Sequence, residues 1–249
     1  MFQLTNRLIK ELGSLDEAKG RRRTGLFVAE GGKCVGELLK AFHARYIFAR
    51  SEWLAENEVQ ADETVEATPA MLRQLTRLQA TPPVIAYFDI PEDTPVPGHK
   101  GLVVALDRIQ DPGNMGTILR CCDWMGVDTV IASPDTVDCF NPKAVQAAMG
   151  ALAHVKVYYT ELCRYLDGFI GPVYGTFLDG ENIYREPLSE SGVIVMGNEG
   201  QGISAEVEKF VDRRLYIPPY PAGSTHVESL NVGMATAITL SQFRSRMKN

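Results

Sequence analysis

Short apolar segments recur along the second half of the chain, and most are followed by a stretch with helical spacing of apolar residues. We expect strands at residues 102–106, 127–132, 155–159, 173–177 and 193–196, and helices at 115–125, 142–149, 161–166 and 205–210. A strand that is apolar throughout has both faces buried, and helices between the strands supply the cover. The pattern predicts an α/β domain whose parallel sheet has helices on both faces.

A smaller α/β pattern occupies residues 1–92. It predicts helices at 5–12, 35–42, 68–75 and 51–57, the last capped by Ser51, and strands at 26–29, 46–49 and 84–88, with another that ends at Val65. Between residues 90 and 100 the chain has three prolines, a glycine and little to bury. We therefore place a linker at 93–100 and a second domain at 101–249.

The formal net charge of −6 argues against a general nucleic-acid binder, but the charge is unevenly distributed. Residues 1–50 hold ten Lys or Arg against five Asp or Glu, with the densest cluster at 21–23. Such a cluster is either a solvated face or a phosphate-binding one. We take Arg21, Arg22, Arg23 and Lys33 as candidates for contact with phosphates.

The five cysteines form no Cys-x-x-Cys pair, which is not the pattern of a zinc site or a disulfide framework. A reducing cytosol is therefore the expected compartment. Cys121 and Cys122 have no base nearby in sequence, so we expect them to pack in the core. The four histidines lack metal-ligand spacing, and only His226 lies where it could contact a ligand. No apolar run approaches the length of a membrane span, so we expect neither a metal nor a membrane partner.

Residues 215–243 combine an apolar helix with an unusually polar start. A strand at 215–217 stops at Pro218-Pro219, and Thr225-x-x-Glu228 is typical of a capping box at the start of a helix. The helix that follows is apolar almost all round, which predicts burial. Its first turn would carry Glu228, Ser229 and Asn231, which need partners there. The stretch is either a capped core helix or a ligand site.

Two further loops follow strand ends, where open α/β sheets bind ligands. Residues 111–116 (DPGNMG) lead into a helix that carries Arg120, and residues 196–202 (MGNEGQG) hold three glycines. The second loop is not the dinucleotide fingerprint, and it has no acidic residue about twenty positions later, which excludes a nucleotide-dependent oxidoreductase. The chain has no Gly-Lys-Ser/Thr, which excludes a P-loop.

Taken together, the three loops resemble the three motifs of the SpoU family of RNA ribose methyltransferases. The matching residues are Asn114-x-Gly116-x-x-x-Arg120, Gly197-Asn198-Glu199-Gly200-x-Gly202, and Ile217-Pro218 followed by Glu228-Ser229-Leu230-Asn231-Val232. The resemblance covers residues 102–243. It continues weakly into the front of the chain, where Arg23-x-x-x-Phe27-x-x-Glu30-Gly31 is similar to the family's ribosomal-protein-like RNA-binding domain.

The resemblance implies a C-terminal parallel-sheet domain with a trefoil knot, preceded by a smaller α/β RNA-binding domain. It also implies S-adenosylmethionine as methyl donor, and a homodimer whose active site borrows residues from the second chain. The family's catalytic positions correspond to Arg120, Asn114, Glu199, Ser229 and Asn231. Its donor-binding positions correspond to Thr176, Leu178, Met196, Gly197, Asn198, Gly202, Ile217, Pro218 and Leu230. The chain departs from the family in a longer 218–228 segment, and in Gln146 and Ala148 where relatives often have serine or arginine.

Arg120 is the expected key residue. A guanidinium is effectively always protonated, so we expect it to bind a phosphate and stabilise a developing alkoxide rather than to act as a general base. The predicted function is transfer of a methyl group from S-adenosylmethionine to a ribose 2′-hydroxyl of tRNA or rRNA in the cytoplasm. The alternatives are a base-methylating enzyme of the same fold group and a catalytically silent RNA-binding protein.

Overall fold

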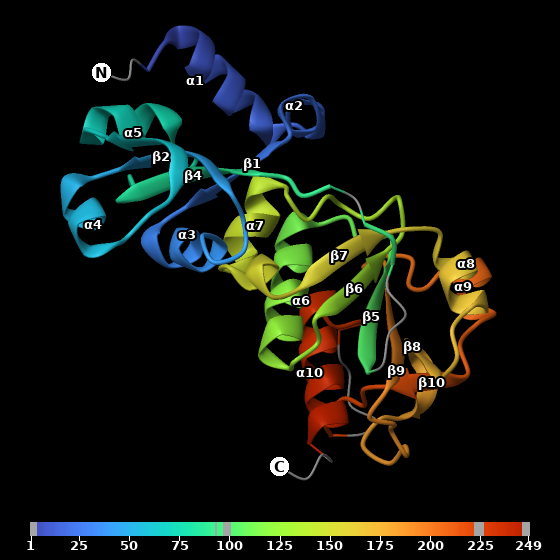
Figure 1. The fold of residues 1–249 in the computed structure, drawn as a ribbon. Coiled ribbons are helices and arrows are strands. Elements are labelled where there is room, and N and C mark those ends of the chain that lie inside the picture. Colours follow the sequence, from blue (N-terminus) through green and yellow to red (C-terminus); the bar gives the residue numbers. More distant parts are fainter. Residues whose placement is uncertain (1–3, 93, 97–100, 222–226, 246–249) are drawn as a thin grey trace. The chain divides into compact units, whose positions relative to one another are not determined.

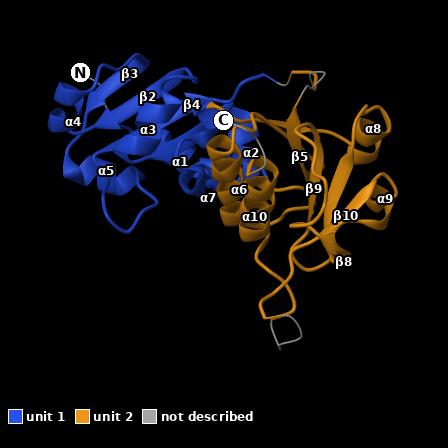
Figure 2. Ribbon diagram, turned by 90° about the horizontal axis from the view of Figure 1, so that it is seen from below, with its two compact units in different colours: residues 1–92, 138–153 blue, residues 93–137, 154–249 orange. Residues whose placement is uncertain are grey.

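The computed structural model describes residues 4–92, 94–96, 101–221 and 227–245 of the 249-residue chain. It forms two compact units, which Figure 2 shows in different colours. Unit 1 contains residues 1–92 and 138–153, and unit 2 contains residues 93–137 and 154–249. No helix in the described part of the chain is long and apolar enough to cross a membrane.

Unit 2 is built on a six-stranded sheet in the order β10-β8-β9-β5-β6-β7, in which every neighbouring pair is parallel. Helices α6 and α10 lie side by side on one face, and α8 and α9 cover the other (Figure 1). The predicted parallel sheet is therefore confirmed. The strands are β5 (Leu102–Asp107), β6 (Thr129–Ala132), β7 (Lys156–Tyr159), β8 (Val173–Asn182), β9 (Gly192–Gly197) and β10 (Arg213–Tyr216), and the helices are α6 (Pro112–Trp124), α8 (Leu162–Asp167), α9 (Ala205–Glu208) and α10 (Val232–Arg244).

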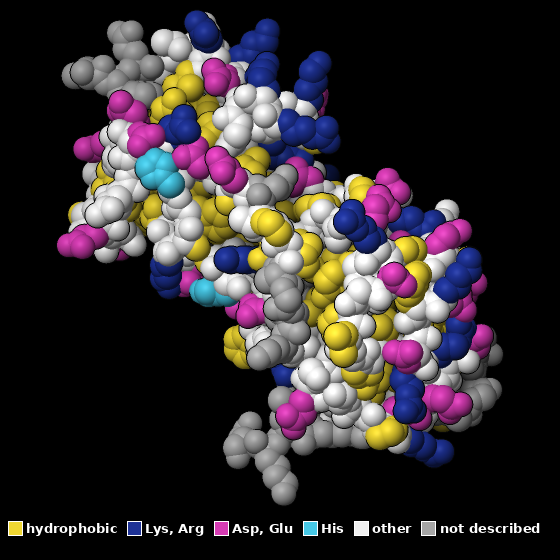
Figure 3. Space-filling view, turned by 45° about the vertical axis from the view of Figure 1, so that its right-hand side comes forward, with side chains coloured by type: hydrophobic (Ala, Val, Ile, Leu, Met, Phe, Trp, Pro, Cys, Tyr) yellow, Lys and Arg dark blue, Asp and Glu magenta, His cyan; other side chains and the backbone are white. Residues whose placement is uncertain are grey.

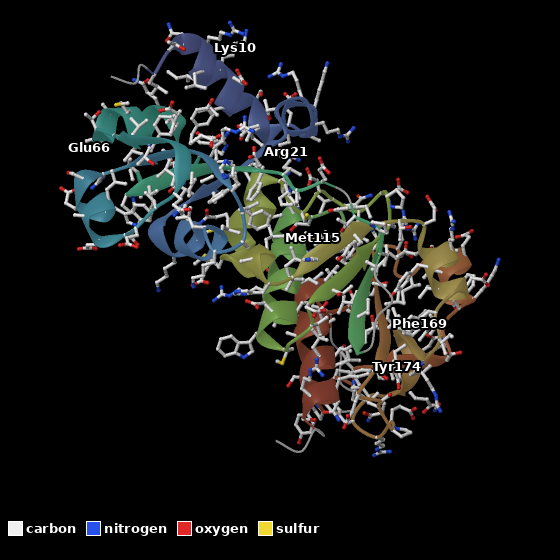
Figure 4. All side chains as sticks on the ribbon, in the orientation of Figure 1. Lys10, Arg21, Glu66, Met115, Phe169 and Tyr174 are labelled. Carbon is white, nitrogen blue, oxygen red and sulfur yellow. The ribbon has the colours of Figure 1, made fainter. Side chains whose placement is uncertain are left out.

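The apolar strands bury both of their faces, as their sequences require. On the side of α8 and α9, Val103, Val195 and their neighbours form one core cluster with Leu162 and Val207. On the opposite side the ring of Tyr174, labelled in Figure 4, packs edge-on against the α10 residue Phe243, with 4.9 Å between ring centroids. Burial of these side chains is the main driving force for the layered arrangement.

Two helices of unit 2, α6 and α10, begin well before and well after their predicted starts, respectively. Helix α6 starts at Pro112 rather than at 115, because the Asp111 carboxylate caps it by accepting the N–H of Asn114 at 2.8 Å. Helix α10 starts at Val232 with Asn231 as its cap. The predicted start at the capping box was wrong, since Glu228 and Ser229 precede the helix; Thr225 and His226 lie outside the described residues.

Helix α10 is also less buried than its composition predicted. Val232, Leu240 and Phe243 are buried, but Met234 is 60% exposed in the single chain. Gly233 packs closely on α6, where a Cβ added to it would lie 2.9 Å from Cγ2 of Thr117. The helix therefore buries one side against α6 and leaves an apolar side uncovered.

Strand β8 is longer than the predicted 173–177 and contains a large bulge. Arg214 of β10 pairs with Gly175, but the next residue, Leu215, pairs with Glu181. The five residues 176–180 therefore leave the ladder. They include Thr176 and Leu178, two of the predicted donor-binding residues.

Unit 1 holds a four-stranded sheet in the order β1-β4-β2-β3. Strand β4 runs antiparallel to β1 and β2, and β2 and β3 are parallel. The strands are β1 (Leu26–Glu30), β2 (Ala44–Ala49), β3 (Ala61–Glu66) and β4 (Val84–Asp89); the helices are α1 (Asn6–Gly13), α2 (Ala18–Thr24), α3 (Gly32–Leu38), α4 (Ser51–Glu56), α5 (Pro69–Leu75) and α7 (Pro142–Ala148), with 3₁₀ turns η1 (Ser14–Asp16) and η2 (Ala151–Ala153). Ser51 is the first helical residue of α4 and not its cap.

Residues 138–153 pack on unit 1 although they lie far from it in sequence. The Phe140 ring lies 4.7 Å from that of Phe27 in β1, and the Cys34 thiol donates to the carbonyl of Val145 at 3.8 Å. The Asp138 carboxylate pairs with Arg21 of α2, whose guanidinium is almost fully buried and is labelled in Figure 4. This ion pair holds the segment against helix α2.

Because Arg21 is buried, Asp138→Asn should lower the free energy of unfolding by about 2 kcal/mol, somewhat less than for a fully buried pair since Asp138 is partly exposed. Chemical denaturation measures this. The exposed pair Lys40–Glu37 is the control, and Lys40→Ala should change stability by less than about 0.5 kcal/mol. If Asp138→Asn is as neutral as the control, the ion pair does not hold the segment in place.

Candidate active site

A chain of side-chain hydrogen bonds joins the three motif loops in unit 2. Asn231, the cap of α10, donates from Nδ2 to Oδ1 of Asn114 at 2.8 Å. Asn114, in the first turn of α6, donates in turn from Nδ2 to Oε1 of Glu199 at 2.8 Å. The three residues are far apart in sequence, and the structure brings them to one place.

The orientation of both amides in this chain follows from their hydrogen bonds. Oδ1 of Asn231 accepts the N–H groups of Gly233 and Met234, at 3.0 and 3.3 Å, so its amide nitrogen is directed to Asn114. The backbone N–H of Asn114 is held by Asp111. Because the amide nitrogen of Asn231 is a donor, Asn114 presents its oxygen to Asn231 and its nitrogen to Glu199.

The loop after β9 closes on itself through Asn198. Its Nδ2 donates to the carbonyl of Arg108 at 2.7 Å, and its Oδ1 accepts the N–H groups of Gly200 and Gln201. Asn198 and Gly202 also exchange two backbone hydrogen bonds. The side chain of Asn198 therefore shapes the loop.

Two glycines, Gly197 and Gly202, allow this loop to fold back on itself. A Cβ at Gly197 would lie 2.3 Å from backbone atoms of Gly202 and Ile203, and Gly202 has φ +70°. A side chain is excluded at Gly197 because there is no space for it, and it is disfavoured at Gly202 because the backbone has a positive φ. An added Cβ would have nothing within 4 Å at Gly202 and would lie 3.8 Å from Oδ1 of Asn198 at Gly200, so both of these glycines leave room for a ligand's approach.

Three residues that hold these loops were not among the sequence candidates. The buried carboxylate of Asp107 accepts the N–H of Ser204 at 2.6 Å, and Asp111 caps α6. Arg108 adopts φ 60°, unusual for a residue with a side chain, and its guanidinium donates to Gln201 at 3.2 Å. Asp-Pro at a helix start is a recognisable cap signature, whereas nothing in the sequence marks Arg108 for a positive φ.

The candidate donor-binding residues follow neighbouring strands at the same edge of the sheet. Oγ1 of Thr176 lies 3.8 Å from the sulfur of Met196, while Ile217 and Pro218 are half-buried after β10. Leu178 and Leu230 are 64% and 46% exposed. This edge of the sheet therefore presents exposed leucines as well as the hydrogen-bonded amides of Asn114 and Asn231. Such a surface suits a ligand with apolar and polar parts, as S-adenosylmethionine has.

Arg120 and Ser229 are not part of the hydrogen-bonded chain. Arg120 lies six residues after Asn114 on α6, about 9 Å along the helix axis. Its side chain is exposed, and no residue in the described part of the chain forms a hydrogen bond or ion pair with its guanidinium. Ser229 is exposed just before Asn231.

The four candidate RNA-binding residues all lie in unit 1, but they differ in exposure. Arg22, Arg23 and Lys33 are exposed, and Lys and Arg side chains gather over α1 and α2 at the top of Figure 3. Arg21 is 2% exposed and paired with Asp138. Its guanidinium is not available to a phosphate in this structure.

A cavity of about 640 Å³ lies at the other edge of the unit 2 sheet, where β5, β6, β8 and β9 begin. It contains none of the candidate residues; its lining includes Gly101, Gly126, Phe169, Gly171, Ser191 and Arg244. Parallel sheets bind ligands beyond the carboxyl ends of their strands, so we place the site at the edge with Asn114. Among the described residues there is no cluster of His, Cys, Asp and Glu that could hold a metal.

Comparison with known proteins identifies the family. Residues 101–241 match the SpoU rRNA Methylase family, and residues 6–86 match the MRM3-like substrate binding domain. The chain belongs to the SpoU family. It is 31% identical to the 23S rRNA guanosine 2′-O-methyltransferase RlmP of Bacillus subtilis, over 96% of both chains. The resemblance inferred from the three motifs is thus confirmed.

Solved structures agree with this assignment. A protein from Porphyromonas gingivalis described as a TrmH-family RNA methyltransferase is 40% identical, covers 99% of this chain and 100% of its own, and has a TM-score of 0.88. An AdoMet-bound rRNA methyltransferase from Sinorhizobium meliloti is 26% identical, covers 100% and 98%, and has a TM-score of 0.83. The predicted fold class is confirmed, and the expected trefoil knot fits this fold.

The capping role of Asn231 can be tested by substitution. Asn231→Ala removes the acceptor for two backbone N–H groups and should lower the free energy of unfolding by about 1 kcal/mol. Asn231→Ser keeps a capping oxygen but cannot reach Asn114 as an amide does, so it should stay within about 0.5 kcal/mol of the unchanged protein. Thermal unfolding of both variants measures this. Equal stability of the alanine variant and the unchanged protein would contradict the capping role.

Proposed function

We propose that this protein methylates a ribose 2′-hydroxyl of ribosomal RNA. As a SpoU-family member it is an S-adenosylmethionine-dependent RNA 2′-O-methyltransferase. The choice of ribosomal RNA is supported by the rRNA substrates in the names of its relatives from Bacillus and Sinorhizobium. The observation that carries the proposal is the Asn231–Asn114–Glu199 chain, which unites the family's three motifs at one edge of the sheet.

We assign the donor to the carboxyl ends of β8, β9 and β10. S-adenosylmethionine supplies an electrophilic methyl group on a sulfonium sulfur. Thr176, Leu178, Ile217, Pro218 and Leu230 offer apolar contact there, and the buried Met196 supports Thr176 from below the surface. Gly197 and Asn198 shape the loop, in which Gly200 and Gly202 leave room for the donor. Methyl transfer is an in-line displacement, so the rate depends largely on how well these groups hold donor and hydroxyl in register.

Glu199 and Ser229 are the groups we assign to the target ribose. Glu199 is exposed, and its Oε1 already accepts from Asn114, which fixes the carboxylate and leaves its other oxygen for a ribose hydroxyl. Ser229 offers an exposed hydroxyl next to Leu230 and Asn231. Their part is to orient the nucleotide, and we assign neither as the general base.

Arg120 acts, in this proposal, in the active site of a second copy of the chain. It is exposed, lies about two turns from Asn114 and has no protein partner in the described residues. The uncovered apolar side of α10 with Met234, and the exposed Leu230 beside it, support a homodimer formed there. In the dimer the guanidinium fork binds the phosphate next to the target ribose and stabilises the developing alkoxide.

Unit 1 holds the RNA substrate through Arg22, Arg23 and Lys33, in our proposal. These side chains are exposed and lie in the most basic part of the sequence, whereas Arg21 serves the internal ion pair. Contacts of this type read phosphates and shape rather than base sequence. All five cysteines are free thiols, which supports a cytoplasmic location.

Arg120→Ala should lower the rate of methyl transfer at saturating substrates by about 10²–10³-fold, as for loss of one charge-stabilising donor, with thermal stability unchanged. Digestion of the RNA product followed by mass spectrometry places the methyl group. A methyl on a base, or full turnover of the variant, would contradict the proposal.

Mixed dimers test whether Arg120 crosses between chains. Arg120→Ala and Leu230→Arg each inactivate a different half of the composite site, so each variant alone should be inactive. Mixing them with subunit exchange should restore about a quarter of the activity, because half of the dimers would hold one intact site of two. Absence of recovery, with exchange verified, would place Arg120 and Leu230 in the same chain's site.

A further inference from the structure

Arg214 contacts the bulge in β8 through its backbone and its side chain. This arginine pairs with Gly175 in the β8–β10 ladder, immediately before the five residues that leave it. Its backbone also runs close to the end of the bulge, since a Cβ added to Gly180 would lie 2.7 Å from the Arg214 carbonyl. The backbone of Arg214 therefore lies against both ends of the bulge.

The Arg214 guanidinium makes three contacts. It lies over the ring of Phe177, 3.6 Å from the ring centroid, and it pairs with the carboxylates of Asp179 and Glu208. Hydrogen bonding from Arg214 holds the pKa of Asp179 below its ordinary value. Planar stacking on a ring together with forked donation to carboxylates is a geometry that arginine provides and lysine does not.

These contacts involve alternate residues of the bulge. Arg214 contacts Phe177 and Asp179. The residue before each of them is a donor-binding candidate: Oγ1 of Thr176 meets the sulfur of Met196, and Leu178 is exposed. The residues that Arg214 contacts thus alternate along the bulge with the candidate donor-binding residues.

We propose that Arg214 is a positioning residue for the methyl donor: it fixes the β8 bulge so that Thr176 and Leu178 face S-adenosylmethionine. The inference rests on the proposed donor-binding role of those two residues. Arg214 itself does not touch the donor. Its loss frees the bulge, so the donor must order that segment as it binds, and affinity falls.

The test compares Arg214→Ala with Arg213→Ala. Arg213 lies next to Arg214 on β10, is exposed and pairs with Glu186, so it controls for loss of a cation and an ion pair on the same strand. Calorimetric titration of the full-length protein with S-adenosylmethionine should give a Kd raised about tenfold for Arg214→Ala and unchanged for Arg213→Ala. Arg214→Lys should fall between, because the charge is kept and the fork is lost.

Steady-state kinetics separate positioning from general damage. Arg214→Ala should raise KM for S-adenosylmethionine about tenfold and leave kcat and KM for RNA within about twofold. A lowered kcat with unchanged KM for the donor would mean that Arg214 only supports the fold. Asp179→Asn, at an exposed carboxylate that tolerates change, should raise the donor's Kd by about threefold even if Arg214→Ala fails to fold.

The outcomes distinguish this inference from the function on which it rests. Unchanged donor affinity in folded Arg214→Ala and Asp179→Asn would overturn the role of Arg214 while leaving the methyltransferase assignment intact. Unchanged affinity in Leu178→Asp would overturn the donor site itself. Failure of the unchanged protein to bind the donor or to methylate RNA would overturn the proposed function.

Discussion

The amide of Asn114 is the contact on which the site depends. Its oxygen accepts from Asn231 and its nitrogen donates to Glu199, so one side chain connects the start of α10 to the loop after β9 from a position at the start of α6. Asn231 is itself anchored by the first N–H groups of α10, and the backbone of Asn114 is held by Asp111. Removing the middle amide would leave both neighbours without their shared partner.

The sheet supplies the frame that makes this contact possible. Because all of its strands are parallel, the residues after β5, β8, β9 and β10 come out at one edge. Close approaches then refine the arrangement: Gly197 lets the loop after β9 fold back on itself, and Gly233 lets α10 lie against Thr117 of α6. These are positions where any side chain would collide with neighbouring atoms.

The sequence predicted the fold class well because apolar strands alternating with helices have few packing solutions. It also predicted the three motif loops, since Asn114, Glu199 and Asn231 occupy recognisable positions. It failed where a local choice depends on tertiary contacts. Thr225-x-x-Glu228 has the spacing of a capping box, yet Asn231 caps α10 and bonds to Asn114 at the same time. A local sequence pattern does not reveal the contact between Asn231 and Asn114, which are 117 residues apart.

Other features could not be predicted for related reasons. Nothing in the sequence distinguishes Arg21 from its neighbours Arg22 and Arg23. In the structure Arg21 is buried in an ion pair with Asp138, which lies 117 residues away in sequence. The bulge in β8 depends on its register with β10, which no pattern within 173–182 encodes. The positive φ of Arg108 is likewise set by what its carbonyl must reach, namely the amide of Asn198.

The most direct test of the account is hydrogen–deuterium exchange on the full-length protein with and without S-adenosylhomocysteine. The account predicts that the ligand slows exchange together in residues 174–182, 196–204 and 214–220 and at the start of α10, all at one edge of the sheet. Protection confined to the segments around Gly126, Gly171 and Ser191, which line the cavity at the opposite edge, would contradict it.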